Sequence, residues 1–214
     1  MVARGLEVPE QAQRDLADAW VAAIEAAGLP VAWTEGARPR PRIAFGAPLP
    51  VGMPANGELI DVVITERWPA WRVREALASH VPTGWRLVET QDVWLAGPPL
   101  AGRVAAADYE IVLAGNPPVE ALREAATRLL AANRLPRQRA RGDTSVGYDL
   151  RPLLLDISVD DGPPVLLTIR TRFHPELGTG RPEEVTAALG DHLGQPLDVA
   201  SMVRERLVLV DDLD

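Results

Sequence analysis

Three arginines alternate with prolines in the segment ARPRPR, at residues 37–42 of this 214-residue chain. A proline favours extended backbone in the residue before it, and side chains two residues apart in an extended chain point the same way. Arg38, Arg40 and Arg42 are therefore predicted to project together. Guanidinium groups suit phosphate and carboxylate ligands, and no acid interrupts the chain between Glu35 and Glu58. The segment is either a binding surface for an anionic ligand such as RNA, or a stiff solvated loop.

A second basic segment, NRLPRQRARGD at 133–143, shows neither helix nor strand periodicity. It holds four arginines: Arg134, Arg137, Arg139 and Arg141. We interpret it as a solvated loop between a helix and a strand. All 22 basic residues of the chain are arginine, which is typical of a GC-rich genome and reduces the weight of any one cluster. The net charge of −8 opposes a broad nucleic-acid-binding face but not a local one.

The composition removes several kinds of catalysis. The absence of cysteine excludes disulfides, thiolate zinc sites and a cysteine-ligated iron–sulfur cluster, and the absence of lysine excludes Schiff-base chemistry and a Walker A loop. The three histidines, at positions 80, 174 and 192, are far apart, and none has a serine partner at a recognisable spacing. No catalytic residue, metal site or cofactor is predicted, so the chain is more easily understood as a non-enzyme when alone.

Hydrophobic periodicity gives the elements of the first half. Strands are predicted at 2–8, 42–47, 58–66 and 85–95. Helices are predicted at 9–27 and 69–80, and Gly28 ends the first of them. All six tryptophans lie in this half, at positions 20, 33, 68, 71, 85 and 94. Most are expected to fill the core; the alternative is that some stack on bases beside the arginines.

The second half repeats the order. Strands are predicted at 107–114, 152–160, 164–173 and 204–210, and helices at 116–133, capped by Asn116, and 181–193. Asp161–Gly162 indicates a hairpin turn. Leu153, Leu155, Ile157 and Val159 would share one face of a strand, opposite Leu154, Asp156, Ser158 and Asp160. The predicted fold class is α+β, with two tandem ferredoxin-like (βαββαβ) domains at 1–97 and 106–214, a linker at 98–105, and antiparallel sheets covered by helices on one side.

Three segments of the chain resemble, in the same order, segments of a radical SAM-associated family of unknown function. The likeness lies in AGLPVAWTEGARPRPRIAFGAPLPVGMPANGELIDVVI (27–64), YDLRPLLLDISV (148–159) and TGRPEEVTAAL (179–189). The resemblance implies an accessory role beside a separate radical SAM enzyme, in the modification of RNA or of a translation component. It also implies further binding residues in these segments: Glu58, Tyr148, Arg151 and Arg181.

The chain departs from the family pattern at three places, one of which is the segment PANGE (54–58), where the family's serine before the strand's glutamate is replaced. The family's Ser-His-x-Asp element is missing from VPEQAQRDLADAW, and Ala37 stands where the family has an aromatic residue. Three hypotheses remain: an accessory protein that presents RNA, an RNA-modifying enzyme with the architecture of a pseudouridine synthase, and a protein–protein adaptor. The enzyme would need a catalytic aspartate; Asp61 and Asp156 lie on predicted strands, but nothing in the pattern singles either of them out. An acid-rich N-terminus and the lack of a long apolar run predict a cytoplasmic protein without a membrane partner. The oligomeric state is open.

Overall fold

A computed structural model describes residues 1–5, 13–93, 98–115, 117–141 and 144–213. The chain forms two compact units, residues 1–104 and 105–214, and each is treated by itself below. Both units mix strands with helices, and the described residues contain five α-helices. None of the described helices has the length and apolar character that a membrane span requires.

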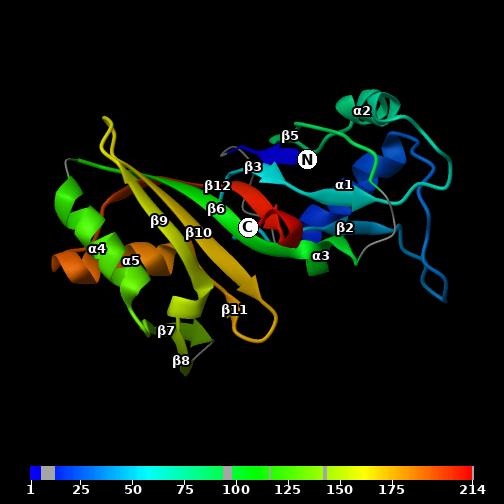
Figure 1. The fold of residues 1–214 in the computed structure, drawn as a ribbon. Coiled ribbons are helices and arrows are strands. Elements are labelled where there is room, and N and C mark those ends of the chain that lie inside the picture. Colours follow the sequence, from blue (N-terminus) through cyan, green and yellow to red (C-terminus); the bar gives the residue numbers. More distant parts are fainter. Residues whose placement is uncertain (6–12, 94–97, 116, 142–143, 214) are drawn as a thin grey trace. The chain divides into compact units, whose positions relative to one another are not determined.

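The first unit is built on short antiparallel strands (Figure 1). Strand β1 lies between β3 and β5, and β2 pairs with β4. Strands β3 and β4 follow one another with only Leu59 between them, so the predicted strand at 58–66 is interrupted and begins earlier than expected. The bounds are β1 (Val2–Arg4), α1 (Gln13–Ala26), β2 (Ile43–Phe45), β3 (Ala55–Glu58), β4 (Ile60–Val62), α2 (Ala70–Ala78), β5 (Trp85–Leu87) and α3 (Leu100–Arg103).

Large side chains fill the small core of this unit. Trp20 of α1 packs edge-to-face on Trp85 of β5, with ring centroids 5.7 Å apart, and Trp20 is only 2% exposed. Ile24 packs with Leu77 of α2 in an adjoining cluster. Helix α1 ends at Ala26, and Gly28 adopts the left-handed φ of 65°, as predicted for a helix-stopping glycine.

The second unit has a four-stranded sheet in the order β9–β10–β6–β12, and β11 pairs with the end of β10. Strands β6, β9 and β10 pair antiparallel, and β9 and β10 form the predicted hairpin. The bounds are β6 (Val104–Leu113), α4 (Val119–Ala131), β7 (Pro136–Arg141), β8 (Thr144–Asp149), a 3₁₀ turn (Arg151–Leu153), β9 (Leu154–Asp160), β10 (Leu166–His174), β11 (Gly178–Thr179), α5 (Pro182–Leu193), β12 (Val199–Leu209) and a second 3₁₀ turn (Val210–Asp212). The predicted cap Asn116 lies outside the described residues.

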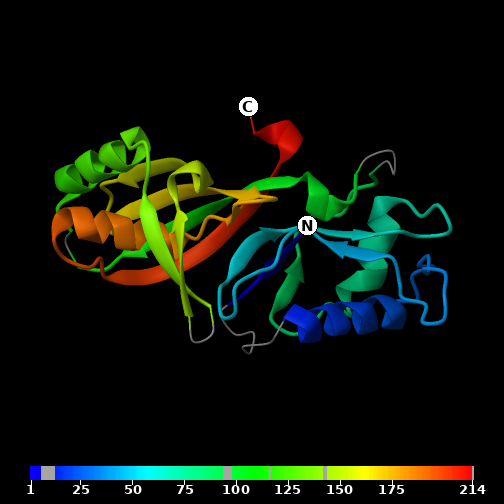
Figure 2. The ribbon, with the colours of Figure 1, turned by 90° about the horizontal axis from the view of Figure 1, so that it is seen from below.

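Helices α4 and α5 lie side by side on one face of this sheet (Figures 1 and 2). Leu122 and Leu129 of α4 and Leu189 of α5 are fully buried against Ile111 of β6 and Leu167 of β10. The one-sided cover predicted from the strand alternation is therefore present in this unit.

Two predictions for the second unit are wrong in detail. The strand alternation predicts that Leu154 faces away from the core, but Leu154 is only 1% exposed. The reason is a bulge: the register between β9 and β10 shifts between Arg170 and Thr171, which leaves Leu155 as the extra residue. The segment at 133–143 was predicted to be a loop, but residues 136–141 form β7, which pairs with β8. Both errors arise from cross-strand pairing that hydrophobic periodicity does not report.

The close approach at Gly180 generates the first testable prediction. A Cβ at this position would lie 2.6 Å from the carbonyl oxygen of Leu153 and 2.8 Å from Cβ of Thr171. Gly180→Ala should therefore lower the free energy of unfolding by roughly 1–3 kcal/mol through overpacking. Urea denaturation followed by circular dichroism measures this, with Gly147→Ala as the control because its nearest atom would be 4.0 Å away. Equal midpoints for both variants would contradict the packing described here.

Candidate nucleic-acid interface

Residues 31–43, which we call the arginine hairpin, fold back on themselves. Trp33 bridges to Pro41 as an antiparallel pair. The N–H of Thr34 donates to the carbonyl of Arg40 at 2.8 Å, and the N–H of Arg40 donates to Oγ1 of Thr34 at 2.9 Å. The bend falls at residues 36–38, where Gly36 supplies a φ of 123° that other residues rarely adopt. The proline-rich stretch is thus a paired hairpin and not a free loop.

The backbone of Arg42 anchors this hairpin to the rest of the first unit. Its N–H donates to the carbonyl of Ala32 at 2.8 Å, and its carbonyl accepts from the N–H of Val63 at 3.0 Å. The N–H of Ala32 donates in turn to the carbonyl of Val63 at 2.7 Å, so three chain segments are joined at one level. Beyond this level the hairpin projects from its unit, as the blue loop at the right of Figure 1 shows.

The side chains of the hairpin arginines are exposed. Arg38 lies in the bend, while Arg40 and Arg42 lie on the returning arm, where alternate positions share a side. Within the described part of the chain, no ion pair or side-chain hydrogen bond involves any of the three guanidinium groups. The hairpin contains one acid, Glu35, which is also exposed. Three unengaged cations and one acid leave a local positive charge on an acidic chain.

The second basic segment has a different electrostatic role. Arg134 pairs with Asp149 at 3.6 Å, and Arg137 pairs with Asp191 of α5. Arg139 donates from Nη2 to the carbonyl of Thr179 at 3.1 Å and lies over the ring of Tyr148, 4.6 Å from its centroid. Arg137 and Arg139 therefore hold the β7–β8 hairpin on its own unit, whereas the guanidinium groups of the arginine hairpin have no partner among the described residues.

Tyr148 and Arg181, two residues that the resemblance singles out, come close enough to affect one another electrostatically. Burial raises the pKa of Tyr148 and the nearby charge of Glu184 raises it further, while Arg139 and Arg181 oppose these effects. Arg181 itself is exposed at the residue before α5. The segments YDLRP and TGRPEE thus lie near one another beside the start of α5.

Arg151 is partly buried and binds backbone carbonyls. Its Nε donates to the carbonyl of Ala132, Nη2 to that of Leu130, and Nη1 to that of Leu154, at 3.1, 2.7 and 2.7 Å. It thereby satisfies carbonyls at the C-terminal end of α4, which have no partner inside the helix. These bonds give Arg151 a structural role, and its role in binding stays a prediction.

Glu58 is also withdrawn from the surface. It is 6% exposed in β3, and its charge opposes the lowering of the pKa of Arg4 that burial causes. Of the predicted site residues, only the arginines of the hairpin and Arg181 are exposed.

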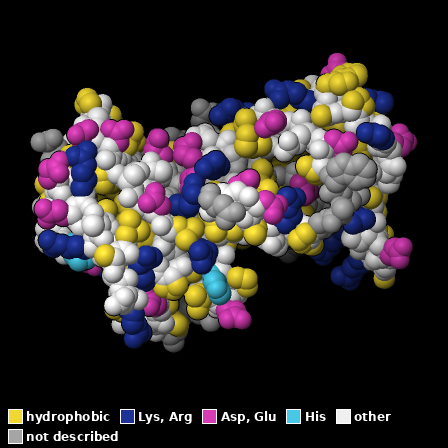
Figure 3. All heavy atoms as spheres, in the orientation of Figure 1, with side chains coloured by type: hydrophobic (Ala, Val, Ile, Leu, Met, Phe, Trp, Pro, Cys, Tyr) yellow, Lys and Arg dark blue, Asp and Glu magenta, His cyan; other side chains and the backbone are white. Residues whose placement is uncertain are grey.

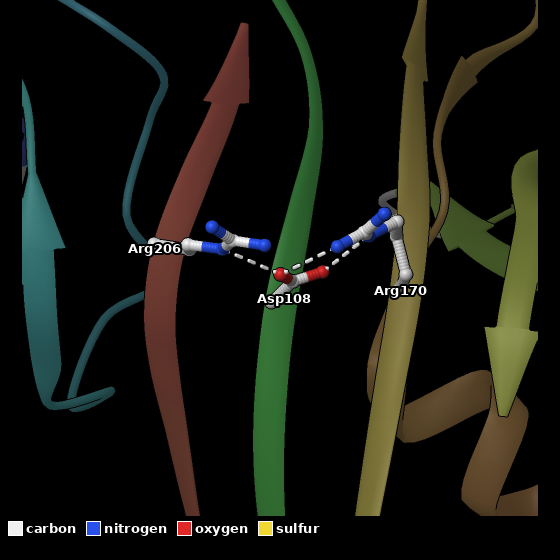
Figure 4. A network of polar contacts seen from close by, with 3 residues as sticks. All are labelled: Asp108, Arg170 and Arg206. Atoms are coloured by element: carbon white, nitrogen blue, oxygen red, sulfur yellow. Dashed lines mark hydrogen bonds and ion pairs between the residues drawn. The ribbon is translucent and has the colours of Figure 1, made fainter. Parts of the chain in front are cut away.

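A third charged group, which the sequence analysis did not single out, lies on the sheet face opposite α4 and α5. Asp108 of β6 accepts from Nε of Arg170 at 2.6 Å, from Nη2 of Arg170 at 3.0 Å and from Nε of Arg206 of β12 at 2.8 Å (Figure 4). Asp108 and Arg170 are direct cross-strand partners. The alternation of charged and apolar residues in both strands is the sequence signal that, with the register, would have revealed the pair.

Positive and negative side chains are interspersed on the molecular face shown in Figure 3, in keeping with the net charge of −8. One cavity of about 540 Å³ lies beside α5 and is lined by Glu183, Thr186, Gly190, Asp191 and residues 194–197 among others. None of the predicted site residues lines this cavity, and two of its side chains are acidic.

These features define an α+β protein that carries an exposed basic hairpin on a paired backbone. Residues 11–187 match the family described as "Uncharacterized protein conserved in bacteria (DUF2344)". The match covers most of the chain, including every predicted site residue, and the chain belongs to this family. No curated protein matches the chain. The match confirms the resemblance at the level of an uncharacterized family and says nothing of a radical SAM partner.

The charged group at Asp108 generates the second prediction. Burial would raise the pKa of Asp108, but the hydrogen bonds and charges of Arg170 and Arg206 outweigh it and hold the pKa below the ordinary value of 3.8. A carboxyl whose pKa is lower in the folded state than in the unfolded state stabilises the fold fully when the pH is above the unfolded-state pKa. This stabilisation is lost as the pH falls through the folded-state pKa. Asp108→Asn should therefore cost about 1–2 kcal/mol at pH 7, a figure reduced by the partial exposure of both arginines.

Urea denaturation at pH 7 and near pH 3 measures the difference. The gap between the native protein and Asp108→Asn should shrink in acid. Glu124→Gln, which removes an exposed helical pair with Arg128, is the control and should change stability by a few tenths of a kcal/mol. A gap that is the same at both pH values would contradict the assignment of the charge to Asp108.

Proposed function

We propose that this protein is a non-catalytic accessory protein that binds RNA through the arginine hairpin and presents it to a separate radical SAM enzyme. The observation that carries the proposal is the contrast between the two basic segments. Arg134, Arg137 and Arg139 have partners within the fold, whereas the guanidinium groups of the arginine hairpin have none among the described residues. Unpaired, exposed guanidinium groups suit phosphate oxygens.

The radical SAM enzyme enters the proposal through the resemblance of the three segments at 27–64, 148–159 and 179–189. A chain without cysteine has no thiolate to ligate an iron–sulfur cluster. Radical chemistry would therefore be performed by the partner, and this protein would contribute substrate binding. RNA or a translation component is the substrate class that the resemblance implies.

We further infer that both units are ferredoxin-like domains. In the second unit, support comes from the element order β6–α4–β9–β10–α5–β12 and the sheet order β9–β10–β6–β12. In the first unit, the corresponding support is that β1 lies between β5 and β3, and that β4, which continues β3, pairs with β2. The β7–β8 hairpin would be an insertion between α4 and β9.

The alternative of an RNA-modifying enzyme requires an acid beside an arginine, and Asp108 with Arg170 is such a pair. Three guanidinium hydrogen bonds already occupy the oxygens of Asp108, and they hold its pKa low. A carboxylate held in this way is suited to joining strands more than to attacking a base. This arrangement favours binding over catalysis as the proposed function.

The test is binding of total cellular RNA by filter retention at several salt concentrations. For single strands, the logarithm of the binding constant falls with the logarithm of salt with a slope of about −0.7 per phosphate contact, so three arginines give about −2. The variant Arg38→Ala/Arg40→Ala/Arg42→Ala should lose most of the salt-sensitive binding. The matched control Arg67→Ala/Arg86→Ala/Arg128→Ala removes the same charge from exposed positions elsewhere and should keep the slope.

Two results would overturn the proposal. One is RNA binding that is insensitive to salt or unchanged in the hairpin variant. The other is capture of a radical SAM enzyme by the purified protein that survives nuclease treatment together with a failure to bind RNA, which would establish the protein–protein adaptor.

A further inference from the structure

We infer that the ligand of the arginine hairpin is a single-stranded nucleic acid, and that Trp33 stacks on one of its bases. The inference rests on the proposed function, because it specifies the ligand of the same hairpin. It adds a residue, Trp33, and a strand state to a surface so far defined by charge alone.

Trp33 differs from the core tryptophans of the same unit. It is 50% exposed, whereas Trp20 is 2% exposed and packs on Trp85. The ring of Trp68 is covered by the guanidinium of Arg72, 3.7 Å from the centroid, but within the described residues the ring of Trp33 has no aromatic or cationic partner. An exposed indole lacks the favourable free energy of burial, and stacking on the face of a base would supply it.

The backbone holds Trp33 in place before any ligand binds. Its neighbours Ala32 and Thr34 are bonded to Arg42 and Arg40 across the hairpin, at 2.8 Å in each case. Trp33 is therefore fixed opposite Pro41, between the two arginines along the partner strand. A backbone that is ordered before binding reduces the conformational entropy lost when the ring stacks.

Pairing also fixes the directions of these side chains. Cross-strand partners share a face of a hairpin, so Trp33 and Pro41 lie on one face, and Arg40 and Arg42 lie on the other. The projecting hairpin is two strands wide. A nucleic-acid strand that follows the edge of the hairpin can set its phosphates against the arginines and turn a base onto the indole.

A duplex does not fit this arrangement. The major groove of A-form RNA is deep and too narrow for side chains to read, and its bases are stacked within the helix. A duplex would therefore contact the arginines but leave Trp33 without a base. Only unstacked bases can use the indole and the guanidinium groups together, so the geometry selects a single strand.

The test uses fluorescence polarisation with the full chain and three labelled probes: a 12-nucleotide oligouridine, an oligodeoxythymidine of the same length and a 12-base-pair RNA duplex. Oligouridine should bind more tightly than the duplex. Trp33→Ala should weaken oligouridine binding roughly 5- to 150-fold, the range for loss of one stacked base. Trp33→Phe should keep most of the affinity, because a phenyl ring also stacks.

The salt dependence separates stacking from charge. Trp33→Ala should leave the slope unchanged, whereas Arg40→Ala/Arg42→Ala should make it shallower by about 1.4, at about 0.7 per phosphate contact. Trp71→Ala is the matched control, since Trp71 is 66% exposed at the start of α2, and it should change nothing. Stacking does not depend on the sugar, so Trp33→Ala should weaken oligodeoxythymidine binding by the same factor.

The two proposals fail in different ways. If the arginine variant loses binding but Trp33→Ala does not, or if the duplex binds more tightly than oligouridine, the single-strand inference is wrong and the hairpin remains an RNA-binding surface. If neither variant changes the binding of any probe, the proposed function fails as well.

Discussion

The main chain of Arg42 joins three segments of the first unit at one level. Its N–H binds the carbonyl of Ala32, its carbonyl binds the N–H of Val63, and Ala32 binds Val63 in turn. Backbone bonds of this kind leave the side chain free, so the residue that fixes the hairpin also presents a guanidinium to solvent. If this junction were absent, a proline-rich stretch would be a mobile basic loop, and every arginine and tryptophan on it would have to be ordered by the ligand at an entropic cost.

The composition of an arginine cluster does not determine whether the cluster is available to bind a ligand. Both basic segments carry similar sequence charge, but Arg134, Arg137 and Arg139 of the second are engaged by Asp149, Asp191 and the carbonyl of Thr179. The arginine hairpin projects where no described acid engages its guanidinium groups. What distinguishes a binding surface from a structural one is thus the tertiary environment. Because all 22 basic residues of this chain are arginine, the two kinds of surface can be told apart only from the tertiary contacts of each arginine.

The sequence predicted the features that local patterns determine. Helices α4 and α5, the hairpin of β9 with β10 and the helix stop at Gly28 follow from periodicity and turn residues. The β7–β8 hairpin was missed because its strands are mostly polar, and the inward turn of Leu154 was missed because a bulge is a property of two strands. The sequence identified the hairpin arginines as candidates, but it did not show that Trp33 is exposed. Nor did it show that Arg151 and Glu58 are engaged or buried inside the fold, since exposure depends on contacts between distant segments.

The account depends on one claim, that RNA contacts the arginine hairpin and not another basic part of the chain. Photo-crosslinking of cellular RNA labelled with 4-thiouridine, followed by mass spectrometry of the attached peptides, tests it directly. The account predicts that the crosslinks concentrate at residues 31–43, with Trp33 among the modified positions. Crosslinks concentrated at residues 134–141, or on the sheet face that carries Asp108, would contradict it.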